Sequence, residues 1–374
     1  MDKQASKPSD SRSLAFGNWP SASDPIQDIR RAMECSAVKR HLKILTNSSV
    51  CDYLSCQEFY HLRIITGIVP LTTRDPFAFG SGAHDWIEKW SLNQPQEFPA
   101  LDDPWESARL RAMLVGYNIR WSDWQTEHVT AVNPDREFAV PLVNPDTGAK
   151  STYWEVRGKL DDIVCVDGEW KVKEIKTSRD TGSGYFERLR IDSQISTYLM
   201  ASKSLALPEP SGVLYDVLKK PQLKPLKRSE SYALNKDGSK PKNKREFDET
   251  PDEYFSRCLD EIAQHPEEYY QHYEVVRLES EVLKAARNLW FTGAMIRESI
   301  RQDRWVQNTK NCRDWITGKF CDYWTICSGV SSPDDASRYM RKAPFQELPE
   351  YQKEITTDAT AEPETESDED PFFL

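Results

Sequence analysis

Acidic and basic side chains recur at short spacing near the middle of the chain. Two runs of alternating, β-branched residues flank Asp167-Gly168, a turn signal, and together predict a β-hairpin. The hairpin brings Asp161 and Glu174 to the ends of adjacent strands. Lys176 falls on the same face as Glu174, because side chains alternate along a strand. Two carboxylates so placed can share a divalent metal ion, and a lysine beside them suits metal-dependent cleavage of a phosphodiester bond.

Ordinary explanations exist for each of these residues. An Asp-Asp pair such as Asp161 and Asp162 also ends strands without any function, and Glu-x-Lys occurs on solvated strand faces. The pair leaves the register ambiguous, and we prefer Asp161 because it follows a Gly-x-hydrophobic spacing. His84, after a glycine-rich approach to a helix, could be a further metal ligand or only a residue of the first helical turn.

The elements that must position these residues alternate in type along the chain. Helices are expected at residues 25–45, 48–67, 79–91, 102–121, 191–205, 251–265 and 280–301. Strands are expected at residues 126–132, 136–143, 151–166, 170–176, 211–219 and 272–278, with turns at 133–135 and 144–148. This order predicts an α/β (or α+β) fold with a mixed central sheet flanked by helices.

Charge is unevenly distributed along the 374 residues, whose formal net charge is -11. The segment Asp358 to Leu374 has seven acidic residues and no basic one, whereas Lys219 to Arg245 has ten basic residues against two acidic. We read residues 1–24 as disordered, 25–345 as one domain and 346–374 as an acidic disordered tail. The basic stretch is either a solvated flexible excursion or a phosphate-contacting loop, so the overall charge does not exclude DNA.

The chain shows no hydrophobic signal segment and no apolar run long enough to cross a membrane, which predicts a cytoplasmic location. Eight cysteines in such a chain argue against a disulfide framework and leave metal binding or burial. Three of them lie close together among aromatic residues, at Cys312, Cys321 and Cys327. We expect Cys165 to point into the core from a strand.

Five motifs in order resemble the RecB-like branch of the PD-(D/E)XK nuclease superfamily, over roughly residues 48 to 330. They are similar in particular to phage-type, exonuclease-like members with a C-terminal cysteine cluster. The matching segments are Gly82-Ala83-His84, Gly158-Lys159-Leu160-Asp161, Glu174-Ile175-Lys176-Thr177, Gln194-x-x-x-Tyr198 and Ser211 to Pro221. Taken alone, Gln194 and Tyr198 would be a routine pair on an amphipathic helix.

The resemblance implies a restriction-endonuclease-like core that hydrolyses DNA and leaves 5′-phosphates. It implies that His84, Asp161, Glu174 and the Ile175 carbonyl bind Mg²⁺ or Mn²⁺, with Asp161, Glu174 and Lys176 as the catalytic residues. It implies that Gln194 and Tyr198 help to hold the DNA. Exonuclease action on single- or double-stranded ends is preferred from resemblance alone. The alternatives are a non-catalytic DNA-binding subunit of a recombination complex and cleavage of RNA.

The cysteines resemble the one-plus-three [4Fe–4S] arrangement of AddB-type and CRISPR-associated RecB-like nucleases. Cys56 would be the distant ligand and Cys51 its rival, with Cys312, Cys321 and Cys327 completing the set. The wide gap between Cys312 and Cys321 departs from the usual Cys-x-x-Cys step, so zinc or unliganded thiols remain alternatives. The acidic tail, ending in Pro371-Phe372-Phe373-Leu374, is similar to the tip by which bacterial single-strand binding proteins recruit partners, although a solvated tail is the simpler reading.

Overall fold

A computed structural model describes residues 43–71, 75–204, 209–229, 245–314, 318–349 and 351–353, and Lys43–Glu354 form one compact unit. The expected disordered N-terminus, the part of the acidic tail after residue 353 and most of the basic stretch lie outside the described residues. The start of the expected disordered tail, at residues 346–349 and 351–353, is wrong, because Leu348 and Tyr351 there are fully buried. The expected helix at 25–45 also lies outside them, except for its end. There Ile44–Leu45 forms a strand, β1, so the prediction is wrong at those two residues.

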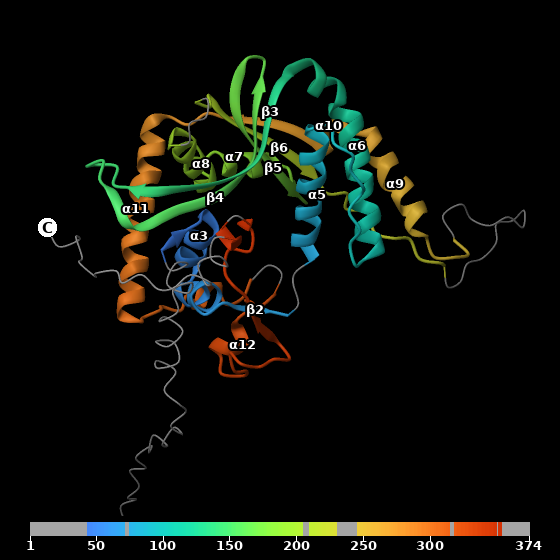
Figure 1. Ribbon diagram of the computed structural model, residues 1–374. Coiled ribbons are helices and arrows are strands. Elements are labelled where there is room, and N and C mark those ends of the chain that lie inside the picture. The colour runs from blue at the N-terminus through green and yellow to red at the C-terminus, as the bar shows by residue number, and fades with distance from the viewer. Residues whose placement is uncertain are drawn as a thin grey trace, which may run out of the picture. The chain divides into compact units, whose positions relative to one another are not determined.

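A mixed sheet forms the centre of the fold, as the alternation of elements predicts (Figure 1). Its strand order is β1-β4-β5-β6-β7, and β3 pairs with the other edge of β4. β1 is parallel to β4 and β5 is parallel to β6, whereas β3–β4, β4–β5 and β6–β7 are antiparallel. The strands are β3 (Val129–Val143), β4 (Lys150–Val166), β5 (Glu169–Ser178), β6 (Gly212–Lys219) and β7 (Tyr270–Val275).

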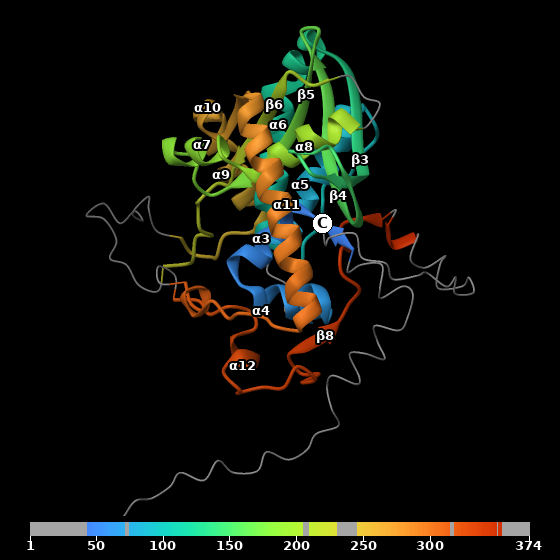
Figure 2. The same cartoon turned by 90° about the vertical axis from the view of Figure 1, so that its left-hand side faces the viewer.

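Helices cover both faces of the sheet (Figures 1 and 2). On one face lie α5 (Asp75–Ser91), α6 (Pro104–His128), α9 (Pro251–Gln264) and the short α10 (Pro266–Tyr269). On the other lie α7 (Ser183–Leu189), α8 (Ser193–Ser204) and α11 (Glu279–Gln302). Local sequence fixes several helix starts: the Thr250 side chain accepts from Glu253 N–H in a capping box before α9.

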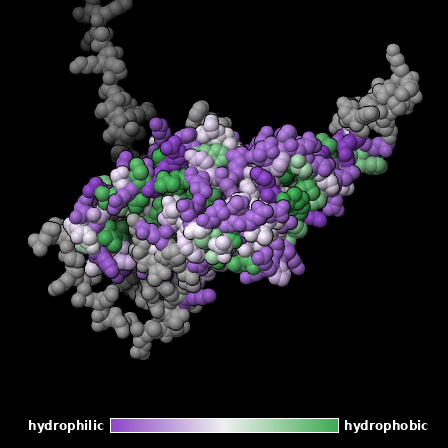
Figure 3. Space-filling model, turned by 90° about the horizontal axis from the view of Figure 1, so that it is seen from above, coloured by the Kyte–Doolittle hydropathy of each residue, from purple (hydrophilic) through white to green (hydrophobic). Residues whose placement is uncertain are grey.

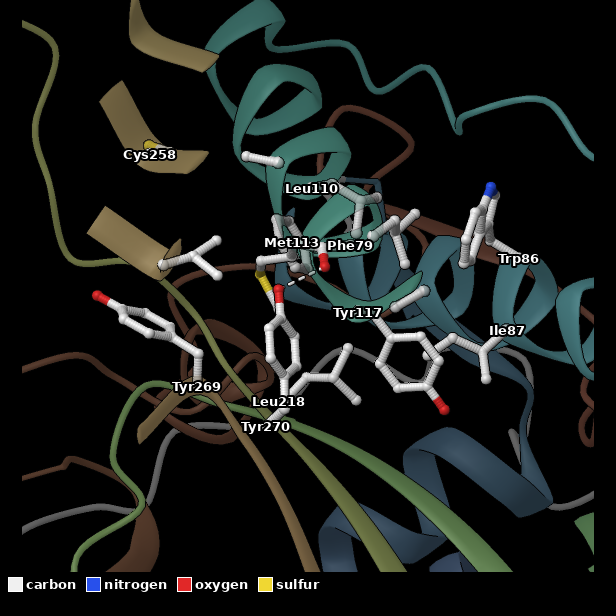
Figure 4. Close-up of a cluster of buried hydrophobic side chains, with 14 of the residues drawn as sticks. Phe79, Trp86, Ile87, Leu110, Met113, Tyr117, Leu218, Cys258, Tyr269 and Tyr270 are labelled. Atoms are coloured by element: carbon white, nitrogen blue, oxygen red, sulfur yellow. Dashed lines mark hydrogen bonds between the residues drawn. The ribbon is translucent and has the colours of Figure 1, made fainter. Parts of the chain in front are cut away.

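A large apolar cluster lies between α5, α6, α9 and the sheet (Figure 4). Phe79 and Ile87 from α5 and Met113 and Tyr117 from α6 pack there with Leu218 of β6, all buried. Tyr270 Oη donates to the Met113 carbonyl at 2.7 Å, so its hydroxyl stays satisfied inside this core. Burial of this size holds α5 and α6 firmly against β5, the strand with Glu174 and Lys176.

A small lobe joins two distant parts of the chain. α3 (Asn47–Ser55), α4 (Gln57–Tyr60), a π-helical turn (His61–Ile65) and β2 (Ile68–Pro70) come from the N-terminal side. A 3₁₀ turn (Thr309–Asn311), α12 (Trp324–Cys327) and β8 (Tyr339–Arg341) come from the C-terminal side, and β8 pairs with β2. Tyr323 Oη donates to the Ile68 carbonyl at 2.7 Å and ties the two halves together.

Four expectations from the sequence need correction. β3 runs through the expected turn at 133–135, and Pro134 pairs opposite Asp162. Among described residues β3 pairs only with β4, and an edge strand tolerates a proline because one side of its backbone needs no partner. The expected helix at 48–67 breaks at Cys56, whose backbone is extended. α6 continues to His128, and the short helix α7 was not expected.

Other expected elements agree with the structure. α8, α9 and α11 form close to the predicted ranges, and Cys165 is 7% exposed in β4, which confirms its expected burial. Seen from above, the surface is mainly hydrophilic, with apolar residues scattered in small groups (Figure 3). No helix among the described residues is long and apolar enough to span a membrane.

Candidate active site

The candidate site lies where β4 and β5 separate. Their ladder ends at the pair Asp162–Lys173, and the next residues along each strand are Asp161 and Glu174. Beyond this pair, Ile175 N–H donates to the Asp161 side chain, at Oδ2 and 2.9 Å, and not to a backbone carbonyl of β4. The paired carboxylates therefore lie at a fork in the sheet that the backbone itself defines.

A glycine allows the neighbouring strand to cover this part of β4. Gly158 lies directly opposite Phe138 of β3, and a Cβ atom at Gly158 would lie 2.6 Å from the Phe138 ring. Phe138 is 1% exposed and packs edge-to-face on Tyr198 at 6.1 Å between ring centroids. The glycine of this motif is thus required for close packing three residues before Asp161.

His84 reaches the fork from α5. Its Nδ1 lies 3.2 Å from Asp161 Oδ1, and its side chain is partly exposed. Burial opposes the charged imidazole, but the adjacent Asp161 outweighs it and raises the pKa of His84. His84 and Asp161 therefore form an ion pair in this arrangement, and binding of a metal ion by both would replace that contact.

Glu174, Lys176 and Gln194 form a chain of polar contacts. Lys176 Nζ lies 2.5 Å from Glu174 Oε1 and donates to Gln194 Oε1 at 2.9 Å. Glu174 is 2% exposed, and its second oxygen, Oε2, is buried without a hydrogen-bond partner. A buried carboxylate oxygen with no partner is costly unless a proton or a cation occupies it.

Tyr198 extends this series of hydrogen bonds from Gln194 to the backbone of β4. Its hydroxyl accepts from Gln194 Nε2 at 2.5 Å and donates to the Lys159 carbonyl at 2.9 Å, and the residue is only 6% exposed. The Lys159 carbonyl lies on the stretch of β4 between the segments paired with β1 and β5. The geometry therefore favours Tyr198 as a residue that positions Gln194 and β4, with Gln194 nearer to any bound substrate.

The charges at the fork influence one another strongly. Burial, together with the nearby Asp161, raises the pKa of Glu174 to about 7. Burial also disfavours ionised Asp161, but His84 and the Ile175 N–H lower its pKa on balance. Burial opposes the Lys176 ammonium, and Glu174 outweighs it, so the pKa of Lys176 is raised. Lys176 therefore keeps its positive charge at neutral pH. A bound metal cation between Asp161 and Glu174 would relieve the repulsion between the two carboxylates.

Asp162 is buried on the opposite face of the sheet, beside a separate polar network centred on Asp216, and neither of its oxygens has a hydrogen-bond partner. Lys173 Nζ lies 3.0 Å from Asp216 Oδ2, and Tyr117 Oη donates to the same oxygen. His272 Nε2 lies 3.6 Å from the other oxygen and stacks on Trp121. Burial raises the pKa of Asp162 to about 7. The structure therefore brings Asp161, not Asp162, together with His84 and Glu174.

Two residues near the fork were not predicted from the sequence. Glu88 lies one helical turn after His84, is half-buried, and the charges of Lys159 and Asp161 both act on it. Its i+4 spacing from His84 on an expected helix was the available signal. Burial raises the pKa of Tyr185 in α7, and the charges of Lys176 and Arg188 act against that rise. No sequence pattern pointed to Tyr185, because its helix was not expected.

The four predicted cluster cysteines line one cavity in the small lobe, although no three of them are arranged around a common ion position in the described part of the chain. Cys56, Cys312, Cys321 and Cys327 line one cavity of about 170 Å³ with Phe59, Tyr323 and Trp324. Asn308 N–H donates to Cys56 Sγ at 3.3 Å. Burial, with the charges of Glu58 and of the other cysteines acting in the same direction, raises the pKa of Cys327 to about 11. The thiols of Cys321 and Cys327, whose pKa values burial raises, therefore stay protonated unless a cation binds them.

Cys51, the rival to Cys56, lies elsewhere. Its Sγ lies 3.8 Å from Ser193 Oγ, and it lines a different, larger cavity between α3, α8 and α11. The geometry therefore favours Cys56 as the partner of the C-terminal cysteines. Cys258 is buried in the main core.

The family is decided by comparison with known sequences. The sequence model of the PD-(D/E)XK nuclease superfamily matches residues 45–328, which include every residue of the fork and of the cysteine cavity. The chain belongs to the PD-(D/E)XK nuclease superfamily. The comparison with curated proteins gives no match.

Similarity to solved structures is distant for this PD-(D/E)XK protein. The chain is similar to one described as "Crystal structure of SSO0001", with 10% sequence identity and a TM-score of 0.28. The match covers 70% of this chain and 85% of that one.

The residues of the fork fit the divalent metal ion that PD-(D/E)XK nucleases typically use. Asp161 and Glu174 supply hard oxygen ligands. Glu174 Oε2 has no hydrogen-bond partner, so its lone pairs are available to a metal ion at the fork. Among the described residues, no three acidic, histidine or cysteine side chains are already arranged around a common ion position.

Proposed function

We propose that the chain is a divalent-metal-dependent DNA nuclease that acts as an exonuclease. The observation that supports this most is the conjunction of Asp161, Glu174 and Lys176 at the fork of a PD-(D/E)XK sheet, with His84 against Asp161. A site without function has no physical need for Glu174 beside Asp161, because burial and the charge of Asp161 raise the pKa of Glu174 to about 7. Such an arrangement costs stability unless a cation is bound.

The ligands in this proposal are Asp161, Glu174, His84 and the Ile175 carbonyl. They would hold Mg²⁺ or Mn²⁺, which stabilises negative charge on the phosphate and assists ionisation of water. His84 adds a nitrogen ligand, which favours Mn²⁺ somewhat more than a site made of oxygen alone.

Lys176 then acts as a cation and not as a base. Its pKa is raised by Glu174, so the ammonium is retained at neutral pH and can donate to the attacking water or to a phosphate oxygen. Gln194 fixes the Lys176 ammonium, and Tyr198 fixes Gln194. The catalytic lysine is therefore positioned by a chain of hydrogen bonds before substrate arrives.

The test is cleavage of end-labelled single- and double-stranded DNA by the wild type and by Lys176→Ala, with Mg²⁺, Mn²⁺ or EDTA. Metal-dependent degradation that Lys176→Ala reduces by about 100-fold or more would support the nuclease, and the label pattern gives the polarity. Lys150→Ala removes an exposed lysine at the far end of β4 and should leave the rate unchanged. Tight DNA binding with no cleavage under any metal would instead identify a non-catalytic subunit.

We also propose that the cysteine cavity holds a [4Fe–4S] cluster bound by Cys56, Cys312, Cys321 and Cys327. The support is their common cavity, the N–H bond to Cys56 Sγ and the raised pKa values of Cys321 and Cys327, which a bound metal would reverse. A cluster would stabilise a lobe that otherwise has a small apolar centre formed by Leu62, Ile68, Tyr323 and Tyr339.

Metal and sulfide analysis of anaerobically purified protein tests the cluster. Iron with matching sulfide and a brown colour are expected, and Cys321→Ser should lose both. Cys51→Ser is the matched control, because Cys51 lies in another cavity. Zinc without sulfide would replace the cluster by a structural zinc site, and metal-free, equally stable protein would remove the proposal.

A further inference from the structure

A short hairpin carries two of the cavity cysteines and presents two other side chains to its outside. Cys321 N–H donates to the Cys312 carbonyl at 2.8 Å, and Arg313 pairs with Phe320 in an antiparallel bridge. Adjacent residues of paired segments point to opposite faces. Cys312 and Cys321 accordingly line the cavity, whereas Arg313 and Phe320 do not.

Phe320 is held in place although half of it is exposed. It is 50% exposed, its ring centroid lies 4.7 Å from that of Trp324, and the Arg313 guanidinium carbon lies 5.4 Å from its ring. Arg313 Nε donates to the Gly318 carbonyl at 3.2 Å, which fixes the guanidinium. An aromatic ring that is half exposed but held by two neighbouring side chains loses little entropy when a flat ligand stacks on its exposed part.

The surrounding segment is basic within an acidic chain. Residues 304–342 contain seven basic and four acidic residues, whereas the whole chain has a formal net charge of -11. The basic residues are Arg304, Lys310, Arg313, Lys319, Arg338, Arg341 and Lys342. This local balance complements a polyanion rather than an acidic protein partner.

We propose that Phe320, with Arg313 and Trp324, forms a stacking platform for an unpaired base of single-stranded nucleic acid. The proposal rests on the nuclease function and names the form of nucleic acid that this lobe binds. Aromatic rings beside arginine bind unpaired bases because every base has a π face that is free only outside a duplex. Trp324 also lines the cysteine cavity, so the platform and the cysteine site share one support.

The experiment is equilibrium binding of a fluorescently labelled oligothymidylate to the full chain, in buffer without added divalent metal ions. Phe320→Ala should bind roughly 5- to 150-fold more weakly, the loss expected when one base–aromatic stack is removed. Phe320→Trp should bind as tightly as the wild type. Phe291→Ala is the matched control. Phe291 is 64% exposed on α11, so this substitution removes an exposed phenylalanine ring at a different place on the surface.

The outcomes separate this inference from the nuclease proposal. Wild type that cleaves DNA while Phe320→Ala binds oligothymidylate normally would overturn the platform and leave the nuclease intact. A wild type that neither binds nor cleaves any nucleic acid would overturn both. An equal loss of duplex and single-strand binding in Phe320→Ala would overturn the single-strand assignment, because a stack on an unpaired base cannot account for it.

Discussion

Adjacent aspartates take opposite roles in this chain because successive side chains in a strand point to opposite faces. Asp161 faces Glu174 and His84 at the fork, whereas Asp162 lies against Lys173 with both of its oxygens buried and unpartnered. Burial and Asp161 raise the pKa of Glu174 to about 7, so the two carboxylates are not both ionised at low cost.

The pH dependence of metal binding follows from Glu174. Because its pKa is raised on folding, Glu174 lowers the free energy of unfolding progressively as pH rises from its unfolded value toward about 7, and the full cost persists above that. A bound cation removes this cost, so Mn²⁺ should raise the melting temperature more at about pH 8 than at about pH 6. His84 has the same effect on the pH dependence: its pKa is raised, and the protonated imidazole at low pH cannot bind a metal ion.

Thermal unfolding with and without Mn²⁺ at the two pH values measures this difference. Glu174→Gln, which keeps the shape and removes the charge, should lose most of the metal-induced shift. An equal shift at both pH values in the wild type would contradict the assignment of Glu174 as a ligand.

The network behind the fork should be structural. Asp216→Ala leaves the Lys173 ammonium buried without its carboxylate, and this change should lower the free energy of unfolding by about 3–5 kcal/mol. Asp146→Ala removes only an exposed ion pair with Arg287 and should cost at most about 1 kcal/mol. Denaturant unfolding compares the two, and similar values would show that Lys173 is not held by Asp216.

At the residue scale, sequence could identify what local motifs encode. His84, Asp161, Glu174 and Lys176 were all named from short patterns, and the structure brings them together. Asp216 and Tyr185 could not be found this way, because their partners come from other elements and depend on how the helices pack on the sheet.

Elements were predictable where periodicity and caps agree, as for α9 and α11. The turn expected at 133–135 was wrong because an edge strand accepts proline and asparagine that a central strand would not. Cys56 interrupts the helix expected at 48–67, and the extended backbone there turns its side chain toward the C-terminal cysteines. Local propensity carries no information on such a long-range contact.

The β3–β4 pair makes a prediction at this scale. Gly158→Ala would place a methyl group 2.6 Å from the Phe138 ring, so it should lower the free energy of unfolding by about 1–3 kcal/mol and reduce metal affinity at Asp161. Gly184→Ala in α7 meets no atom within 4 Å and should be neutral or slightly stabilising. Equal stability of the two variants would refute the packing argument.

At the scale of the whole molecule, the cysteine cavity joins a segment that precedes most of the central sheet in the chain with a segment that follows it. Cys56 precedes α5, and the other three cysteines follow α11. Figures 1 and 2 both show α12 beside the α3–α4 segment. Because the apolar centre of this lobe is small, we expect the four thiols and their metal to supply much of its stability.

Limited proteolysis tests this role. Cys56→Ser should expose residues 303–342 to cleavage before the sheet domain is attacked, whereas Cys51→Ser should digest as the wild type does. Mass spectrometry of the fragments locates the first cuts. Identical digestion of all three proteins would show that the lobe is stable without the cysteine site.

The most direct test of the central claim compares metal-dependent DNA cleavage by Asp161→Asn and Asp162→Asn. The two residues are adjacent and chemically identical, but only Asp161 faces His84 and Glu174. Asp161→Asn should lose activity by about 100-fold or more, as expected when a charged ligand is removed, while Asp162→Asn should cleave at close to the wild-type rate. Activity retained in Asp161→Asn and lost in Asp162→Asn would place the chemistry on the other face of the sheet and contradict the account.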